Sequence, residues 1–386
     1  MRHRNTILAS ILKAVPRRRF EGFVERHGGD RYVKRLRTWD QFVALSHAQL
    51  SNCGSLRAVE TGWNANAHHH YHLGAGPVRR STLADANRQR PSEIFADLFN
   101  WLSGLADRRI RREGSEMVRL IDSSPVPVGE LFKWARWNGR IKGLKLHVVY
   151  DPHGDHPRLA EITPANINDV NVGRDIALEP GAMYVFDKGY SDYHWWNELH
   201  GAGCGFVTRP KSNVRFKTVA THCGPFEPGD GCTVLEDSRV VHQTRGHVRL
   251  EMELRRIKIR RHKDGREMAL ITNDLGRTAD EIAMLYKTRW QIELLFRWIK
   301  QHLKIRSFLG RSENAVRTQI LVAMITYLLL RIAAKVHGVD LTPIRFIELV
   351  GQSLFERKDI THIDKPPEPL HRPKYTHPNQ LAFVYG

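Results

Sequence analysis

The chain has 386 residues, and its 60 Lys and Arg against 41 Asp and Glu give a formal net charge of +19 and a pI of about 10.0. This excess of cations argues against an ordinary metabolic enzyme and predicts a polyanionic partner, with nucleic acid favoured over a membrane surface. Hydrophobic residues make up 41% of the chain, which is enough for a packed core and excludes a disordered protein.

Two further classes are disfavoured by the cysteines and the apolar runs. The four cysteines contain no CxxC pair, which argues against a disulfide framework and a zinc ribbon. The longest apolar run, Ile320–Leu330, ends at Arg331 and is shorter than the roughly 20 residues of a membrane-spanning helix, so we expect a buried core helix. The amino-terminal residues 1–5 are charged and no apolar signal segment follows them, so we expect a cytoplasmic protein with no membrane partner.

Residues 1–112 have the pattern of a basic, all-helical region. Arg17–Arg19 and the segment Arg31–Arg37 concentrate positive charge, and an amphipathic stretch covers Ser92–Leu105. This pattern fits a DNA-binding helix-turn-helix and a helical bundle with a cationic surface equally well.

From Glu116 onward the pattern changes to strands that alternate with helices. Three strands in a row, followed by alternating helices and strands, predict an α/β fold with a mixed sheet and helices packed on it. The expected strands are Met117–Asp122, Leu144–Tyr150, Arg158–Ile162, Ala182–Asp187 and Gly205–Thr208, and the expected helices are Asp169–Leu178 and Tyr193–His200.

The rest of the chain divides into three parts. Residues 211–277 are strand-like and rich in turns, for example at Val248–Leu254, and we expect a β-rich insertion there. Thr278 and Glu281 form a capping box ahead of a long helix through Ile305, and a further helix covers Ser312–Val336. Residues 341–386 should contain a C-terminal helix and a Pro-rich tail that is irregular after Lys365.

Two carboxylates follow apolar strands. Asp122 and Asp187 each stand at the predicted carboxyl end of a strand, where open α/β sheets place their active crevices. One such Asp is more often a turn or cap residue. Two of them fit a two-metal phosphoryl-transfer site, which needs hard oxygen ligands from separate rigid elements and takes Mg²⁺.

The predicted long helix offers a third acid. Tyr286, Arg289, Glu293 and Lys300 lie within about 60° of one another on a helical wheel, at the border of the apolar face. Glu293 can be a metal ligand, with Arg289, Lys300 and Tyr286 contacting a phosphate. Alternatively, it forms intrahelical ion pairs with Arg289, four residues before it, and Arg297, four residues after it.

These residues carry a resemblance to a known family. Tyr286, Arg289, Glu293 and Lys300 match without gaps the Y-(2)-R-(3)-E-(6)-K signature of DDE transposases of the insertion sequence four family. Asp122 in Leu-Ile-Asp-Ser-Ser and Asp187 in Phe-Asp-Lys-Gly-Tyr resemble that family's first two catalytic aspartates.

The resemblance implies an RNase H-like, mixed-sheet catalytic core with a β-rich insertion and an all-helical N-terminal DNA-binding region. It implies five parts: a DNA-binding region at 1–112, the first part of the core at 113–210, the insertion at 211–277, the completed core with the Glu293 helix at 278–340, and the C-terminal helix and tail at 341–386. Asp122, Asp187 and Glu293 would be catalytic and would hold two Mg²⁺ ions, for which Mn²⁺ can substitute.

The function implied is cut-and-paste transposition. Such an enzyme binds the terminal inverted repeats of its own element as double-stranded DNA, cleaves strands with Mg²⁺ and joins the freed 3′-hydroxyl to target DNA, as a homodimer in the synaptic complex. In a prokaryotic cell it would be cytoplasmic and associated with the nucleoid. The alternatives are a catalytically inactive DNA-binding repressor derived from such an element and a general RNase H-like nuclease.

Overall fold

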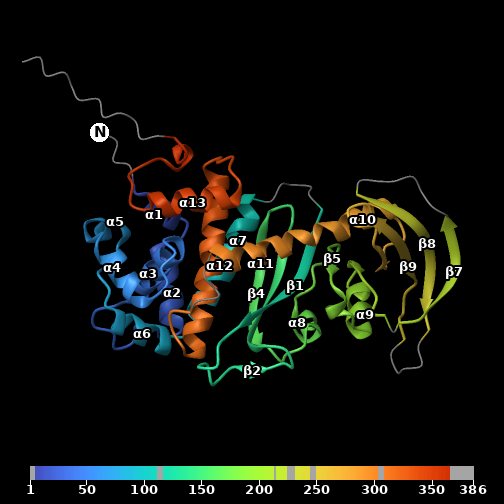
Figure 1. Cartoon of the computed structure of the whole chain (residues 1–386), viewed down its shortest axis with the longest axis horizontal. Coiled ribbons are helices and arrows are strands. Elements are labelled where there is room, and N and C mark those ends of the chain that lie inside the picture. The colour runs from blue at the N-terminus through green and yellow to red at the C-terminus, as the bar shows by residue number, and fades with distance from the viewer. Residues whose placement is uncertain are drawn as a thin grey trace, which may run out of the picture.

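The computed structural model describes residues 5–110, 116–212, 214–223, 231–243, 249–302 and 308–365. The molecule is elongated, with a helical lobe at one end, a sheet in the middle and further strands at the other end (Figure 1). The predicted irregular tail after Lys365 lies outside the described residues.

Residues 5–110 form most of the helical lobe. Its helices are α1 (Ile7–Leu12), α2 (Arg17–Arg26), α3 (Thr38–Leu50), α4 (Leu56–Asn64), α5 (His70–Leu73), α6 (Arg80–Gln89) and α7 (Glu93–Ile110). Buried aromatic rings join them, since the ring centroid of Phe20 lies 5.3 Å from that of Trp39 and 5.4 Å from that of Phe42. These contacts bury large apolar areas and fix α2 against α3.

Two C-terminal helices, α12 (Glu313–Val336) and α13 (Pro343–Ser353), complete the lobe. The Ser312 hydroxyl accepts a hydrogen bond from the Ala315 N–H and caps α12. Among the described residues α12 is the one helix long and apolar enough to cross a membrane, but 83% of its most apolar window is buried inside the structure. The prediction of a buried core helix over Ile320–Leu330 is therefore confirmed.

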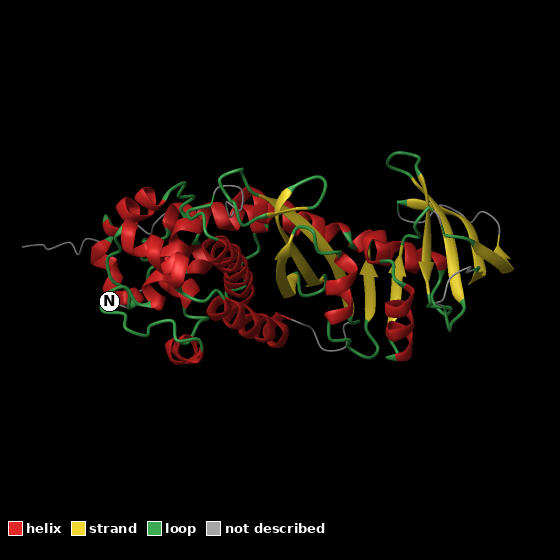
Figure 2. Cartoon of the chain, turned by 90° about the horizontal axis from the view of Figure 1, so that it is seen from below, coloured by secondary structure: helices red, strands yellow, loops and turns green. Residues whose placement is uncertain are grey.

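Within the described residues, ten strands form one mixed sheet that runs from the middle to the far end of the molecule (Figure 2). The strands are β1 (Val118–Pro127), β2 (Arg136–Trp137), β3 (Lys142–Asp151), β4 (His156–Pro164), β5 (Met183–Phe186), β6 (Gly205–Thr208), β7 (Phe216–Cys223), β8 (Cys232–His242), β9 (Leu254–Arg261) and β10 (Glu267–Thr272). The fold class is therefore mixed α/β, as predicted.

The pairing divides the sheet into an antiparallel, a parallel and a second antiparallel part. β3 pairs antiparallel with β1, β2 and β4, and β5 lies parallel between β1 and β6. β10 then pairs antiparallel with β6 and leads to β9, β8 and β7. The strands of the segment 211–277 thus extend the same sheet.

Helices cover both faces of the sheet; they are α8 (Asp169–Asp175), α9 (Tyr193–Gly201), α10 (Ala279–Thr288) and α11 (Trp290–His302). Side chains alternate between the faces along each strand. Leu120 and Val185 belong to the core that includes residues of α10 and α11, whereas Ile121 and Phe186 belong to the core that includes residues of α9.

The first correction to the sequence analysis concerns β1. The strand was expected to end at Asp122, but it continues to Pro127 because it pairs with β3 from Leu120 opposite Tyr150 to Pro127 opposite Gly143. Asp122 therefore lies inside the strand.

The second correction concerns the predicted helix from Thr278 through Ile305. The capping box of Thr278 and Glu281 is confirmed, but the helix breaks at Arg289 into α10 and α11. Tight turns mark the break, where the Arg289 N–H donates to the Tyr286 carbonyl at 3.2 Å and the Ile292 N–H to the Arg289 carbonyl at 3.2 Å.

The third correction concerns the expected strand Val248–Leu254. Residues 249–253 are not a strand, and β9 begins at Leu254, where pairing with β8 begins. Val248 itself lies outside the described residues.

Candidate active site

The parallel pairing of β1 and β5 brings Asp122 and Asp187 side by side. The last parallel pair in the register is Ile121 opposite Phe186, and the next residue of each strand is an aspartate. Neighbouring strands are about 4.8 Å apart, so the two carboxylates emerge at adjacent positions. The two aspartates thus lie where the parallel pairing ends, although β1 itself continues.

Strand alternation also decides which way the two carboxylates point. Asp122 follows Leu120 by two residues and Asp187 follows Val185 by two, so both share the face that α10 and α11 cover. This is the face on which Glu293 lies, because α11 packs against β1.

Arg289 joins two of the three acids directly. Its Nη1 lies 3.1 Å from Oδ2 of Asp122, and its Nη2 forms an ion pair with Glu293 one turn further along the chain. The pair with Asp122 is largely screened from water, since 17% of the Arg289 side chain and 18% of the Asp122 side chain are exposed, whereas 31% of the Glu293 side chain is exposed. One guanidinium thus bridges the first and third predicted acids.

Burial changes the acidity of Asp122. Desolvation raises the pKa of its carboxyl from 3.8 to about 6, and the neighbouring charges of Asp187 and Glu293 act in the same direction. Arg289 and the hydrogen bond from the Ser123 N–H, 2.8 Å long, partly offset this rise. A buried carboxyl with a raised pKa beside other acids is typical of catalytic sites.

Asp187 and Tyr286 have buried oxygen atoms that lack protein partners. Within the described part of the chain, neither Asp187 Oδ1 nor the Tyr286 hydroxyl has a hydrogen-bond partner. The Tyr286 ring lies beneath Arg289, whose Cζ is 5.7 Å from the ring centroid, and burial raises the pKa of the Tyr286 hydroxyl. A buried carboxylate oxygen without a donor calls for a ligand such as a cation or water.

The donor set suits a hard divalent cation, because the carboxylate oxygens of Asp122, Asp187 and Glu293 are the ligands that Mg²⁺ prefers. In the described residues no three His, Cys, Asp or Glu side chains are arranged as a ready metal site. The cation that bridges Asp122 and Glu293 here is Arg289. The residues therefore fit a metal, but their present arrangement binds a guanidinium.

Lys300 lies apart from this cluster. It follows Glu293 by seven residues on α11, about 10 Å along the helix axis, and it is half-buried. The structure thus joins Asp122, Arg289 and Glu293 directly, puts Asp187 and Tyr286 beside them, and places Lys300 two turns away.

A polar cluster that the sequence pattern did not predict lies on the opposite face of the sheet. The Ser123 hydroxyl donates to Asp169 Oδ1 at 3.0 Å, and Lys145 Nζ donates to the same oxygen at 2.8 Å. Buried His147 lies next to them, and desolvation lowers the pKa of its imidazole to about 4. This cluster holds the chain directly after Asp122; the sequence signal was the polar pair Lys145 and His147, two residues apart on an otherwise apolar strand.

The chain is similar in sequence to known transposases. A family model described as Transposase DDE domain matches residues 113–329, and one described as a domain of unknown function matches residues 3–76. The chain is 53% identical over 305 residues to a Sinorhizobium fredii protein named "Putative transposase y4zB", covering 78% of this chain and 85% of that protein. It is 28% identical over 260 residues to the "Probable transposase for insertion sequence element IS5377" of Geobacillus stearothermophilus, covering 65% of this chain and 66% of that protein.

Among solved structures, the piggyBac transposase synaptic complex with hairpin DNA aligns with 95% of this chain and 83% of its own, with a TM-score of 0.47 and 11% identity, which is too distant to carry a conclusion. The family match covers more than half of the chain and includes β1, β5 and α11, the elements that carry the three acids. The chain therefore belongs to the transposase DDE domain family and is an enzyme of DNA transposition.

Proposed function

We propose that this transposase binds the terminal inverted repeats of its own insertion sequence, cleaves DNA strands with Mg²⁺ and transfers the freed 3′-hydroxyl to target DNA. The observation that carries the proposal is the β1–β5 register, in which Ile121 pairs with Phe186 and an aspartate follows each residue. Two adjacent carboxylates on the face that α11 covers are the geometry that a phosphoryl-transfer site requires.

Asp122, Asp187 and Glu293 are the catalytic acids in this proposal and would hold the metal. Membership of the DDE domain family implies a divalent ion in general; the choice of Mg²⁺, with Mn²⁺ as a substitute, and the number of two ions belong to the proposal. When bound, such ions lower the pKa of an attacking water and stabilise charge on the phosphate. The partnerless Oδ1 of Asp187 and the raised pKa of Asp122 support these assignments.

Arg289, Tyr286 and Lys300 form the phosphate-binding group. Arg289 has a planar fork of donors that suits either two carboxylates or a DNA phosphate. It now pairs with Asp122 and Glu293, and a divalent cation would compete with it for the same oxygens. The Tyr286 hydroxyl, which has no partner within the described residues, is a donor available to the same phosphate.

The larger assembly follows from the same proposal. The mixed sheet with its helices would be an RNase H-like core, the strands of 211–277 an insertion into it, and the helical region 1–112 a DNA-binding part. The net charge of +19 supports association with double-stranded DNA and with the nucleoid of a prokaryotic cell. A homodimer would bring two element ends together.

The test is a cleavage assay on a duplex that carries the DNA flanking the coding region, with Mg²⁺ or with EDTA. Each of Asp122→Asn, Asp187→Asn and Glu293→Gln should lower the cleavage rate at least about a thousandfold while binding of the same duplex persists in EDTA. The matched control is Asp85→Asn, which removes one negative charge from an exposed helix and should cleave normally.

Three results would contradict the proposal. A variant of any of the three acids that nicks at the normal rate removes that residue from the site. A wild-type protein that binds the ends without metal-dependent cleavage is a repressor. Cleavage at random positions with no joined products indicates a general nuclease.

A further inference from the structure

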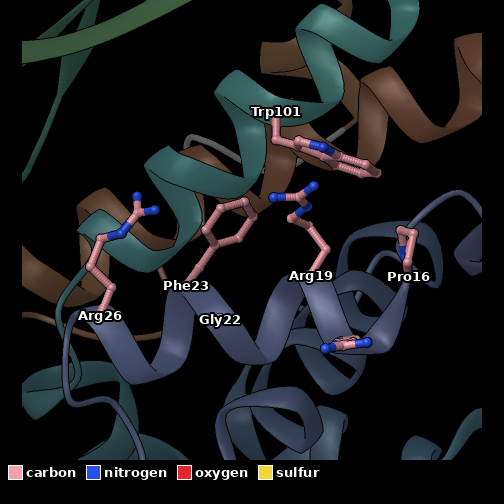
Figure 3. A pocket seen from close by; sticks show the side chains of 7 residues that line it. Pro16, Arg19, Gly22, Phe23, Arg26 and Trp101 are labelled. Atoms are coloured by element: carbon pink, nitrogen blue, oxygen red, sulfur yellow. The ribbon is translucent and has the colours of Figure 1, made fainter.

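A cationic groove lined by residues of α2 and α7 lies in the helical lobe. Figure 1 shows these two helices apart from the strands β1 and β5, which lead to Asp122 and Asp187. Its volume is about 560 Å³, and it is lined by Pro16, Arg18, Arg19, Gly22, Phe23, Arg26 and Trp101. Arg19, Phe23 and Arg26 come from one face of α2 and point towards α7, which supplies Trp101 (Figure 3). The lining combines guanidinium groups with aromatic rings and contains no acid.

Two of the three lining arginines are not neutralised by the protein. Arg18 and Arg19 are exposed, and neither has an ion-pair partner among the residues that the structure describes. Arg26 Nη1 pairs with Oδ2 of Asp97 on α7 at 2.7 Å, and the same oxygen lies 2.9 Å from His27 Nε2. The groove thus keeps an uncompensated positive charge beside one ion pair at its edge.

The neighbouring Arg17 shows what a structural arginine looks like in the same helix. Its Nε lies 3.0 Å from Glu21 Oε1, its Nη1 donates to the Gly74 carbonyl at 3.0 Å, and its Cζ lies 4.6 Å from the Trp39 ring centroid. Arg17 therefore ties α2 to the rest of the lobe. Arg18 and Arg19 have no such task in the fold, so their charges are available to an external ligand.

The groove is held on a rigid support. Phe23 is buried in the lobe's core. One turn earlier on α2, the ring of Phe20 stacks on that of Phe42. The groove is open at Gly22, where an added Cβ would have no heavy atom within 4 Å. A groove with a fixed wall and an unfilled floor needs no rearrangement to accept a ligand.

We propose that the α2–α7 groove binds the sugar–phosphate backbone of duplex DNA, at a second contact outside the acidic site. Guanidinium groups pair with phosphate oxygens through parallel N–H bonds, and the half-exposed indole of Trp101 offers a flat apolar surface to a deoxyribose beside them. The inference rests on the proposed function, since it takes its ligand from the DNA on which a transposase acts. It adds the site by which the helical lobe anchors that DNA.

The probe is a fluorescein-labelled, mixed-sequence 30-base-pair duplex, titrated with the full chain in EDTA at several NaCl concentrations and followed by anisotropy. Contacts to the DNA backbone are independent of base sequence. Each phosphate contact that is lost makes the plot of log K against log salt concentration less steep by about 0.9, and it lowers the affinity roughly eightfold at 0.1 M salt. Arg19→Ala should show this change. Arg57→Ala, which removes an exposed charge from α4 outside the groove, is the matched control and should bind as wild type does.

Gly22 provides a second variant that tests the groove without removing an arginine. Gly22→Glu adds a Cβ that has no heavy atom within 4 Å, and it replaces glycine in a helix by a better helix former. Its carboxylate stands three residues after Arg19 and four before Arg26, so it neutralises both and should weaken the duplex at least as much as Arg19→Ala does. Gly22→Ala should bind the duplex as wild type does. Thermal melting followed by circular dichroism should show that Arg19→Ala, Gly22→Glu and Gly22→Ala are folded.

Wild-type affinity and salt slope in Arg19→Ala and Gly22→Glu would overturn the inference, as would an equal loss in Arg57→Ala. Poly-L-glutamate that binds as tightly as the duplex and depends equally on Arg19 would show a general polyanion site, and the assignment to DNA would fail. Because the titration uses EDTA, it is independent of cleavage. If the groove variants bind DNA more weakly but the wild-type protein shows no Mg²⁺-dependent cleavage, only the catalytic assignment is refuted. If cleavage is normal and the groove variants bind DNA as wild type does, only the groove proposal is refuted.

Discussion

Replacing Asp122 by asparagine should stabilise the fold while abolishing cleavage. Burial raises the pKa of the Asp122 carboxyl from 3.8 to about 6, so the folded protein holds this proton more tightly than the unfolded chain does. Above about pH 6 the ionised carboxylate therefore costs stability. At about 1.4 kcal/mol per pH unit the cost is about 3 kcal/mol, to within about 1.4 kcal/mol.

The sign and the pH window follow from proton linkage. Between pH 3.8 and about 6 the native state binds more protons than the unfolded state, so wild-type stability falls as the pH rises through this window. Asparagine resembles the protonated carboxyl and carries no charge, so its burial does not incur the desolvation cost of an ionised carboxylate. The gain of Asp122→Asn should therefore reach about 3 kcal/mol at pH 8, shrink as the pH falls, and disappear only once the pH is well below 3.8.

The assay is urea unfolding in EDTA at pH 8 and at pH 4.5, followed by circular dichroism. Asp85→Asn raises the net charge by the same amount on an exposed helix, where 59% of the acid's side chain is solvent-accessible, and should change stability by less than about 0.5 kcal/mol. If Asp122→Asn is less stable than wild type at pH 8, the attraction to Arg289 outweighs desolvation, and the reasoning about this site is refuted.

Arg289→Gln should bind Mn²⁺ more tightly than wild type at pH 8 by electron paramagnetic resonance, because the competing cation on Asp122 is removed; unchanged or weaker binding would refute this competition. Arg119→Met should lower the free energy of unfolding in urea by about 3–5 kcal/mol, because it removes the guanidinium that lies 3.4 Å from the buried Asp151 carboxylate. A decrease of less than about 1 kcal/mol would contradict this prediction. Gly143→Ala should destabilise by at least about 1–3 kcal/mol, because the added Cβ meets the Val126 carbonyl of the paired strand β1; a melting temperature equal to that of wild type would show that the strands can shift freely.

Local signals in the sequence determined where most elements begin and which residue types form the site. The capping box of Thr278 and Glu281 and the Ser312 cap act over three residues, so they are readable without a fold. The apolar runs that end in Asp122 and Asp187 predicted strands and two nearby acids, because parallel strands bring corresponding positions together. The family resemblance drew on the same residues and was confirmed at the level of the transposase DDE domain.

The tertiary structure decided what these residues contact. β1 runs past Asp122 because β3 pairs along it, and this pairing joins residues far apart in the chain. Arg289 breaks the expected helix and pairs with Asp122, 167 residues away, as well as with Glu293, so helical spacing alone predicted only the second partner. Sequence periodicity reports which face of an element is apolar over a few residues, whereas the desolvation that raises the pKa of Asp122 depends on every element packed around it.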